Sequence, residues 1–249
     1  MRERLEQIRT SAGTMETFVA SPDTAPRGAV ILYMDVWGIR EELRSIASDI
    51  AARGYTCLLP DLFYRDGRIR HEFMDEQGRL RSLTSLTPQE QEQVRGPMRR
   101  LTDAMAMDDT RALLDFMADG FPTIGAVGYC MGGRHALLAG GFFPERIKVA
   151  ACLHGSNLVD ESAASPHLVA ARSKGEAYCG FAERDPFGSQ QVRERIKTEF
   201  AKAGARLTCV VHAGADHGYA LPQRDVHDAH ATRLDWAEIH AMLARSEAQ

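Results

Sequence analysis

Gly128-Tyr129-Cys130-Met131-Gly132-Gly133 marks an abrupt change from strand to helix, and this stretch decides the fold. The apolar run Ile124 to Tyr129 leads into it, and a helix is predicted from Met131 to Gly140. A turn this sharp strains its central residue, and glycines two positions to either side avoid a collision with it. The pattern predicts a nucleophile, Cys130, raised above the end of a sheet at the positive end of a helix, where a thiolate is favoured. A buried structural cysteine is the alternative interpretation.

Alternating strand and helix patterns extend from this turn in both directions. Further strands are predicted at residues 15–20, 29–34, 55–59, 148–153, 176–181 and 206–212, and amphipathic helices lie between most of them. This alternation predicts an α/β fold in which helices cover both faces of a mainly parallel central sheet. The length of 249 residues and the lack of a boundary between two cores predict a single domain over residues 1–249.

Residues 65–100 interrupt the alternation, because the apolar periodicity vanishes there. We expect a polar excursion over the surface, of the kind that often shapes a binding site. Thr87-Pro88-Gln89-Glu90 combines an N-cap, a proline at the first helical position and a glutamate at the third. A short helix is therefore predicted to start inside the excursion.

The composition is that of an ordinary soluble protein, with 44% hydrophobic and 26% charged residues and a net charge of -4. The mild acidity argues against a nucleic-acid partner, which usually needs an excess of Lys and Arg. The first ten residues carry five charges and no apolar stretch, and no run is long enough to span a membrane, so we expect a cytoplasmic protein without a membrane partner. It is expected to be a monomer or a homodimer. Five cysteines without a C-x-x-C pair predict neither a disulfide framework nor a zinc site.

Two more residues complete a candidate catalytic triad. His217 comes directly after the last predicted strand, and Asp185 follows the strand that ends at Phe181. The chain order Cys130, Asp185, His217 is the order of nucleophile, acid and base in α/β-hydrolases. Glu183 and Asp216 are rival acids, one or two positions off the matching places.

Five pieces of the chain resemble the dienelactone hydrolase family of α/β-hydrolases, and together they span most of its length. They are Asp35-Val36-Trp37-Gly38, Pro60-Asp61-Leu62-Phe63, the turn around Cys130, Cys179-Gly180-Phe181 before Asp185, and His217-Gly218-Tyr219. The resemblance implies hydrolysis of a carboxylic ester or lactone through a thioester acyl-enzyme, as in a carboxymethylenebutenolidase, without a metal or an organic cofactor. The turn itself offers the backbone N–H of Met131 to an oxyanion, and the resemblance implies the N–H of Val36 as the second donor.

Two positions depart from the family's lactone hydrolases. Asp35 stands where they carry a glutamate that helps to activate the nucleophile, and it is shorter by one methylene. Leu221 stands where they carry an arginine that binds the substrate carboxylate. Arg224 is the nearest arginine, and one from the stretch Arg95 to Arg100 is an alternative. These departures bear on the substrate, because a buried carboxylate without a charged partner is costly.

The remaining candidates concern substrate binding and alternative functions. The residues expected to contact a small-molecule substrate are Asp35, Trp37, Tyr64, Arg95, Arg99 and Tyr219, of which Trp37 and Tyr64 are equally compatible with ordinary core aromatics. His154, at the end of a strand, is expected to make a structural hydrogen bond. A non-catalytic or regulatory ligand-binding protein of the same fold, and a redox-sensing thiol at Cys130, are the competing hypotheses.

Overall fold

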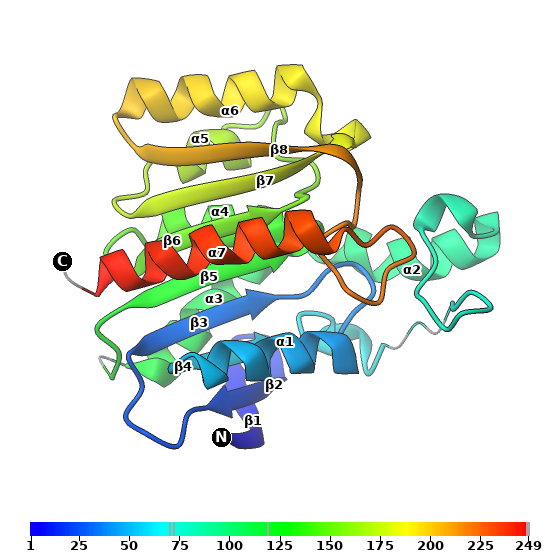
Figure 1. Ribbon diagram of the computed structural model, residues 1–249. Helices are drawn as coiled ribbons and strands as arrows, with labels where there is room; N and C mark the ends of the chain where they lie inside the picture. The colour runs from blue at the N-terminus through cyan, green and yellow to red at the C-terminus, as the bar shows by residue number, and fades with distance from the viewer. Residues whose placement is uncertain (70, 72, 119, 248–249) are drawn as a thin grey trace.

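The computed structural model describes residues 1–69, 71, 73–118 and 120–247, which build an eight-stranded sheet with helices on both sides (Figure 1). The strand order is β1-β2-β4-β3-β5-β6-β7-β8, with β1, β2 and β4 paired antiparallel and all other neighbours parallel. The strands are β1 (Arg2–Thr10), β2 (Gly13–Ser21), β3 (Gly28–Tyr33), β4 (Tyr55–Pro60), β5 (Ile124–Tyr129), β6 (Ile147–Leu153), β7 (Glu176–Arg184) and β8 (Arg206–Asp216). The predicted α/β fold with a mainly parallel sheet is confirmed.

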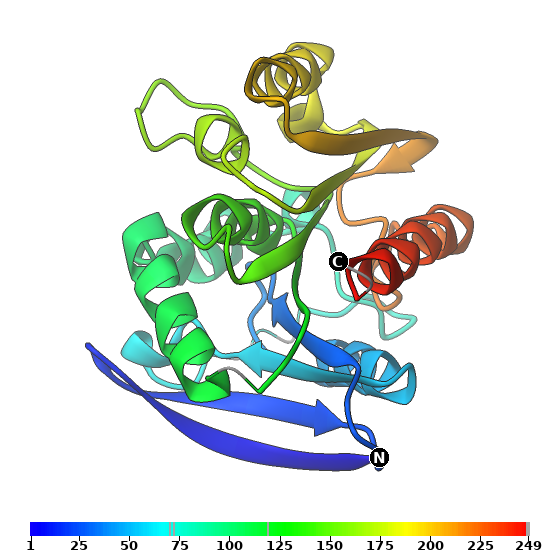
Figure 2. The same cartoon turned by 90° about the vertical axis from the view of Figure 1, so that its left-hand side faces the viewer.

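The helices form two layers around the sheet. They are α1 (Glu41–Ala52), α2 (Pro88–Arg100), α3 (Asp103–Met117), α4 (Met131–Phe142), α5 (Pro166–Ala170), α6 (Gln190–Ala203) and α7 (Ala229–Ser246), with short 3-10 turns η1 (Tyr64–Asp66), η2 (Leu83–Ser85) and η3 (Pro186–Gly188). Helices α1 and α7 cover one face, and α3, α4, α5 and α6 cover the other (Figures 1 and 2). In the part of the chain that is described, no helix has the length and apolar character needed to cross a bilayer.

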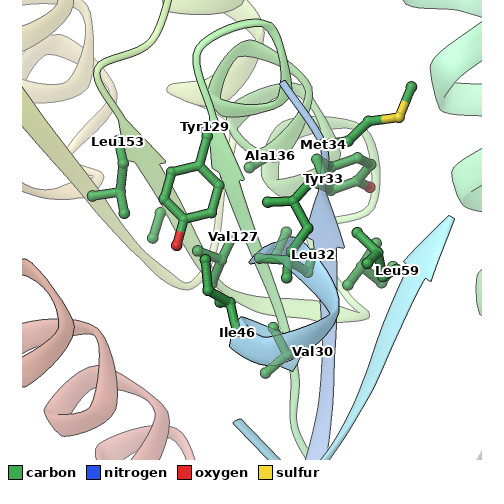
Figure 3. Packing of buried hydrophobic residues seen from close by; sticks show 14 of the residues in the cluster. Val30, Leu32, Tyr33, Met34, Ile46, Leu59, Val127, Tyr129, Ala136 and Leu153 are labelled. Carbon is green, nitrogen blue, oxygen red and sulfur yellow. The ribbon is translucent and has the colours of Figure 1, made fainter. Parts of the chain in front are cut away.

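The central strands are buried along their whole length, which is why they read as continuous apolar runs rather than as alternating ones. Val30 and Leu32 of β3 lie close to Ile46 of α1, and Tyr129 of β5 lies nearby in the same apolar cluster (Figure 3). The buried Tyr33 hydroxyl on the opposite face is paired with Thr110 of α3 at 2.8 Å. Both helical layers are thus anchored on the strands that lead to the turn at Cys130.

Strand β1 was not predicted, because charged residues dominate it and only Ile8 is buried. It pairs with β2 over its full length, from Arg2 opposite Ser21 to Thr10 opposite Gly13. As an exposed edge strand it needs little apolar surface, and its charged side chains discourage pairing with another chain.

The described residues of the excursion at 65–100 lie beyond the carboxyl ends of the parallel strands (Figure 1). Helix α2 begins at the predicted capping box, where Thr87 and Glu90 bond each other's backbone N–H, and it continues as far as Arg100. The excursion is tied to the segment before α7, because Ser82 donates from both its N–H and its hydroxyl to the Asp225 carboxylate, at 2.9 and 2.7 Å. The excursion and the segment before α7 together cover this end of the sheet.

The turn between β5 and α4 requires glycine at two positions. Cys130 has φ 53° and ψ −115°, which is strained for a residue with a side chain. A Cβ on Gly128 would lie 2.0 Å from the Gly132 carbonyl oxygen, and a Cβ on Gly132 would lie 2.4 Å from the carbonyl oxygen of Met34. The backbones of β5, α4 and the end of β3 therefore approach too closely for a side chain at position 128 or 132.

Replacing Gly128 by alanine should consequently lower the free energy of unfolding by about 3 kcal/mol or more, because backbone atoms must move to admit the new methyl group. Gly96→Ala is the matched control, since its Cβ would meet only the tip of the Arg100 side chain at 3.4 Å within α2. That change should be neutral or stabilise by about 0.5–1 kcal/mol. Urea unfolding followed by circular dichroism measures both, and equal stabilities would contradict the steric account.

Candidate active site

A cavity of about 660 Å³ opens at the carboxyl ends of the strands, and Cys130 and His217 lie on its wall. Its lining comes from the loops after β3, β5, β6, β7 and β8 and from the excursion. Apolar walls are supplied by Val36, Trp37, Leu83, Met98, Pro186, Phe187 and Val226, and polar ones by Asp35, Ser82, Thr84, Arg95, Ser156, Asn157, Arg184, Asp216 and Arg224. The site thus stands where ligands bind in parallel α/β sheets.

The three triad residues predicted from the sequence meet at this cavity. His217 Nε2 lies 3.2 Å from Cys130 Sγ, and its Nδ1 lies 2.8 Å from Asp185 Oδ2. Asp185 Oδ1 also accepts the N–H of Phe187 at 2.8 Å, so the carboxylate is held from both sides. The arrangement lets Asp185 orient the imidazole while the other ring nitrogen faces the sulfur.

The rival acids are engaged elsewhere. Glu183 accepts the backbone N–H of Gly214 at 2.8 Å, and Asp216 pairs with Arg184 at the edge of the cavity. Neither carboxylate is within hydrogen-bonding distance of the His217 ring. Asp185 alone of the three has the geometry of the orienting acid.

The electrostatic surroundings favour a positively charged His217. Burial by itself would lower the pKa of His217, but the neighbouring sulfur of Cys130 and the Asp185 carboxylate outweigh it and raise this pKa to about 10. A proton that leaves the thiol therefore has a place on the imidazole. Such a thiolate–imidazolium pair is the activated form of a cysteine nucleophile.

His154 packs against the triad without joining it. Its ring meets that of His217 edge-on at 5.0 Å, and both of its ring nitrogens are buried without a partner among the described residues. The structural hydrogen bond expected from its ring is therefore absent there. Burial and the nearby positive charge of His217 hold the pKa of His154 well below its usual range, so it stays neutral beside the triad.

Tyr219 lies behind His217 and does not line the cavity. Its hydroxyl donates to the fully buried Asp235 of α7 at 2.5 Å, and the same carboxylate accepts from Tyr178 and is paired with His212, each at 2.6 Å. Asp235 was not among the sequence candidates. Its network fixes the position of the loop that carries His217 rather than reaching a substrate.

The expected oxyanion donors, Met131 and Val36, lie on adjoining segments. Met131 is the first residue of α4, where backbone N–H groups have no partner within the helix. The close approach of Gly132 to the carbonyl oxygens of Tyr33 and Met34 brings the segment that follows β3 against the start of α4. Val36, two residues beyond Met34, lines the cavity beside Cys130.

Asp35 lines the cavity, but its carboxylate already accepts hydrogen bonds from other residues of the protein. It forms a two-point ion pair with Arg40, with N···O distances of 2.8 and 3.1 Å, and it accepts the N–H of Trp37 at 3.0 Å. Arg40 also contacts the buried Glu42. Asp35 therefore forms a polar wall of the cavity and shapes the loop that carries Val36.

The other candidates for substrate contact divide into two groups. Trp37 and Arg95 line the cavity, as expected. Arg99 is exposed and pairs with Glu92, while the Tyr64 hydroxyl bonds Thr10 at 2.6 Å and Asp109 at 3.0 Å. The geometry gives Arg99 and Tyr64 no part in the cavity.

Arg224 is the buried cation of the cavity, although the sequence analysis named it only as the arginine nearest to the position of Leu221. It is 5% exposed, and no carboxylate pairs with it in the described part of the chain. Its guanidinium lies over the Trp37 ring at 5.5 Å, and its Nε has no hydrogen-bond partner. Burying a cation without a counter-ion carries a desolvation cost.

Comparisons with known proteins agree with the fold. Residues 15–246 match the model of the dienelactone hydrolase family. A carboxymethylenebutenolidase of Rhodococcus opacus is 27% identical over 51% of this chain and 44% of its own length, so the chain spans under half of that relative. A Methylorubrum extorquens protein, provisionally named a carboxymethylenebutenolidase, is 24% identical over 94% of this chain and 77% of its own.

Solved structures show the same architecture. One from Klebsiella pneumoniae subsp. pneumoniae MGH 78578, provisionally named a dienelactone hydrolase, superposes with a TM-score of 0.83 at 21% identity and covers 98% of both chains. A dienelactone hydrolase-like promiscuous phosphotriesterase from metagenomic libraries gives a TM-score of 0.73 at 17% identity, covering 98% of this chain and 99% of its own. The family match over nearly the whole sequence and the shared fold lead to one conclusion: the chain belongs to the dienelactone hydrolase family.

Proposed function

We propose that this protein hydrolyses a carboxylic ester or lactone that carries an anionic group, with Cys130 as its nucleophile. The observation that carries the proposal is the chain of contacts from Cys130 Sγ through His217, both on the wall of a cavity, to the buried Asp185 carboxylate. The family membership, and the name of the Rhodococcus opacus relative, support the reaction class. The unpaired Arg224 in the same cavity supports the charge of the substrate.

The proposed reaction has two halves. The Cys130 thiolate attacks the carbonyl carbon, a C–S bond forms, and the carbonyl π electrons move to oxygen, which the N–H groups of Met131 and Val36 stabilise. The intermediate then expels the alkoxide or enolate, which takes the proton from His217 Nε2, and a thioester remains. In the second half His217 removes a proton from water, the hydroxide attacks the thioester, and the thiolate leaves.

A non-catalytic ligand-binding protein is the competing proposal, and the triad geometry weighs against it. Binding alone does not need an imidazole between a sulfur and a buried carboxylate, because each buried ionisable group carries a desolvation cost. The redox-sensor hypothesis for Cys130 has less support, since the other cysteines lie in strands β4, β6, β7 and β8 rather than beside it.

Brief exposure to a panel of p-nitrophenyl esters and small lactones should leave an acyl group on Cys130, which peptide mass spectrometry locates. Turnover by Cys130→Ala should fall by about 10⁴-fold or more, because the nucleophile is gone. Cys57→Ala, which removes a buried thiol outside the cavity, is the control and should keep wild-type turnover. Full activity in Cys130→Ala would overturn the mechanism, and the absence of both adduct and turnover would favour a binding role.

The protonation of His217 offers a second test, followed by NMR of ¹⁵N-labelled imidazole. In the wild type the ring should stay protonated through neutral pH and lose its proton only as the pH rises toward about 10. In Cys130→Ala the sulfur no longer raises this pKa, while burial still lowers it, so the pKa should fall. Cys57→Ala should leave it unchanged, and a wild-type His217 that titrates at the usual value of about 6.5 would contradict the ion pair.

The anionic substrate class rests on Arg224 and is tested with two matched esters. One p-nitrophenyl ester has an acyl chain that ends in a carboxylate, and its counterpart ends in an isopropyl group of similar shape. Arg224→Gln should raise KM for the anionic ester by about 30-fold or more, since losing one partner of a buried charge pair costs about 2 kcal/mol or more. The neutral ester should be nearly unaffected.

Arg99→Gln is the control for charge removal, because Arg99 is exposed and lies outside the cavity. It should leave KM for both esters unchanged. Equal losses for both esters in Arg224→Gln would mean that the residue only supports the fold, and the anionic substrate class would be withdrawn.

A further inference from the structure

The Cys130 sulfur has a second polar neighbour that the triad does not include. Ser156 Oγ lies 3.8 Å from Cys130 Sγ, within reach of a hydrogen bond to sulfur, and the serine lines the cavity and is 6% exposed. Its hydroxyl has no other hydrogen-bond partner among the described residues. The Ser156 hydroxyl is therefore available for a hydrogen bond with Cys130 Sγ.

The backbone around Ser156 holds it in this place. His154 and Asn157, on either side, have φ angles of 39° and 50°, a region that residues with side chains rarely adopt. Gly155 packs so tightly that a Cβ would lie 2.2 Å from Cys152 Sγ, and the Ser156 N–H donates to the Cys130 carbonyl at 3.2 Å. Strain of this kind persists only where surrounding contacts impose it, and it is typical of active sites.

The direction of the hydrogen bond depends on the state of the sulfur. While the sulfur is a thiol, its S–H can point at Ser156 Oγ. Once the proton has moved to His217 Nε2, the sulfur has nothing to donate, and the serine hydroxyl can rotate to donate to it. A hydrogen bond to an ionised acceptor is stronger than one between neutral groups.

The other groups around the sulfur cannot take this role. Asp35 is an acceptor already paired with Arg40, and Asp185 lies on the far side of the His217 ring. The cavity's remaining charged groups are Arg95, Arg224 and the Arg184–Asp216 pair, and no hydrogen bond joins any of them to Sγ. In the described part of the chain, Ser156 is thus the one hydroxyl that joins His217 at the sulfur.

We propose that the Ser156 hydroxyl is a further catalytic group, which donates a hydrogen bond to the ionised Cys130 sulfur and so supports the nucleophile. The inference rests on the proposed function, because it assigns a role at the same reacting atom. The hydroxyl stabilises the thiolate in the resting enzyme and again when deacylation returns the electron pair to sulfur. No bond to Ser156 is made or broken in either step.

The test is the rate at which iodoacetamide alkylates Cys130 as a function of pH, with the modified cysteine located by mass spectrometry. In Ser156→Ala the pH of half-maximal rate should rise by about one unit, the size expected for loss of a charge-assisted hydrogen bond, while the plateau rate at high pH stays unchanged. At a pH well below the midpoint this shift is about a tenfold slower alkylation. Ser156→Thr keeps a hydroxyl and should restore the wild-type midpoint.

Ser162→Ala is the matched control, because Ser162 is an exposed serine on the same connection between β6 and α5. An unchanged midpoint in Ser156→Ala, or a uniform loss of rate at every pH that Ser156→Thr does not restore, would overturn the role of Ser156. A Cys130 that resists alkylation at every pH in the wild type would instead contradict the proposed nucleophile. The two failures are therefore distinguishable.

Discussion

The rest of the structure depends on the contact between backbones at the turn after β5. Gly128 lies against the Gly132 carbonyl, and Gly132 lies against the carbonyls at the end of β3. A side chain at either place would separate α4 from the sheet. Because the approach is this close, the start of α4, Cys130 and the segment that carries Val36 come together without any contribution from a ligand. The site is preorganised, which is what stabilisation of a developing oxyanion requires.

Among the described residues that line the cavity, the buried Asp35 has a counter-ion and the buried Arg224 has none. Asp35 is neutralised by Arg40, Asp185 faces His217, and Asp216 faces Arg184. Asp35 and Asp185 are buried, and buried charges are tolerated when they are paired and hydrogen-bonded. The Arg184–Asp216 pair is exposed, so none of the three pairs requires a ligand. Arg224 differs because the described residues leave its guanidinium without a carboxylate. The cavity therefore keeps one buried positive charge that the described residues do not neutralise.

Features with a signal in the local sequence could be predicted, whereas features that depend on long-range contacts could not. The turn at Cys130, the buried strands and the start of α2 each have a signal within a few residues. Strand β1 lacks one, since β2 stabilises it from across the hairpin. No local pattern marks Arg224 or Ser156 as a cavity residue, because each reaches the cavity only through loops that are far apart in the sequence. Asp235 had a usable signal, because it interrupts the apolar stripe of α7, where only a well-bonded carboxylate is stable.

The proposed reaction centre and the rest of the cavity have different structural origins. The proposed triad and oxyanion donors follow strands of the sheet, whereas much of the opposite wall comes from the excursion and from the segment before α7. These two segments are bonded to each other, through Leu80 N–H to the Gln223 carbonyl at 2.7 Å and through Ser82 to Asp225. A movement of the excursion would therefore carry the backbone next to Arg224 with it. The shape of this wall therefore depends on the two segments together, whereas the position of Cys130 is fixed by the sheet.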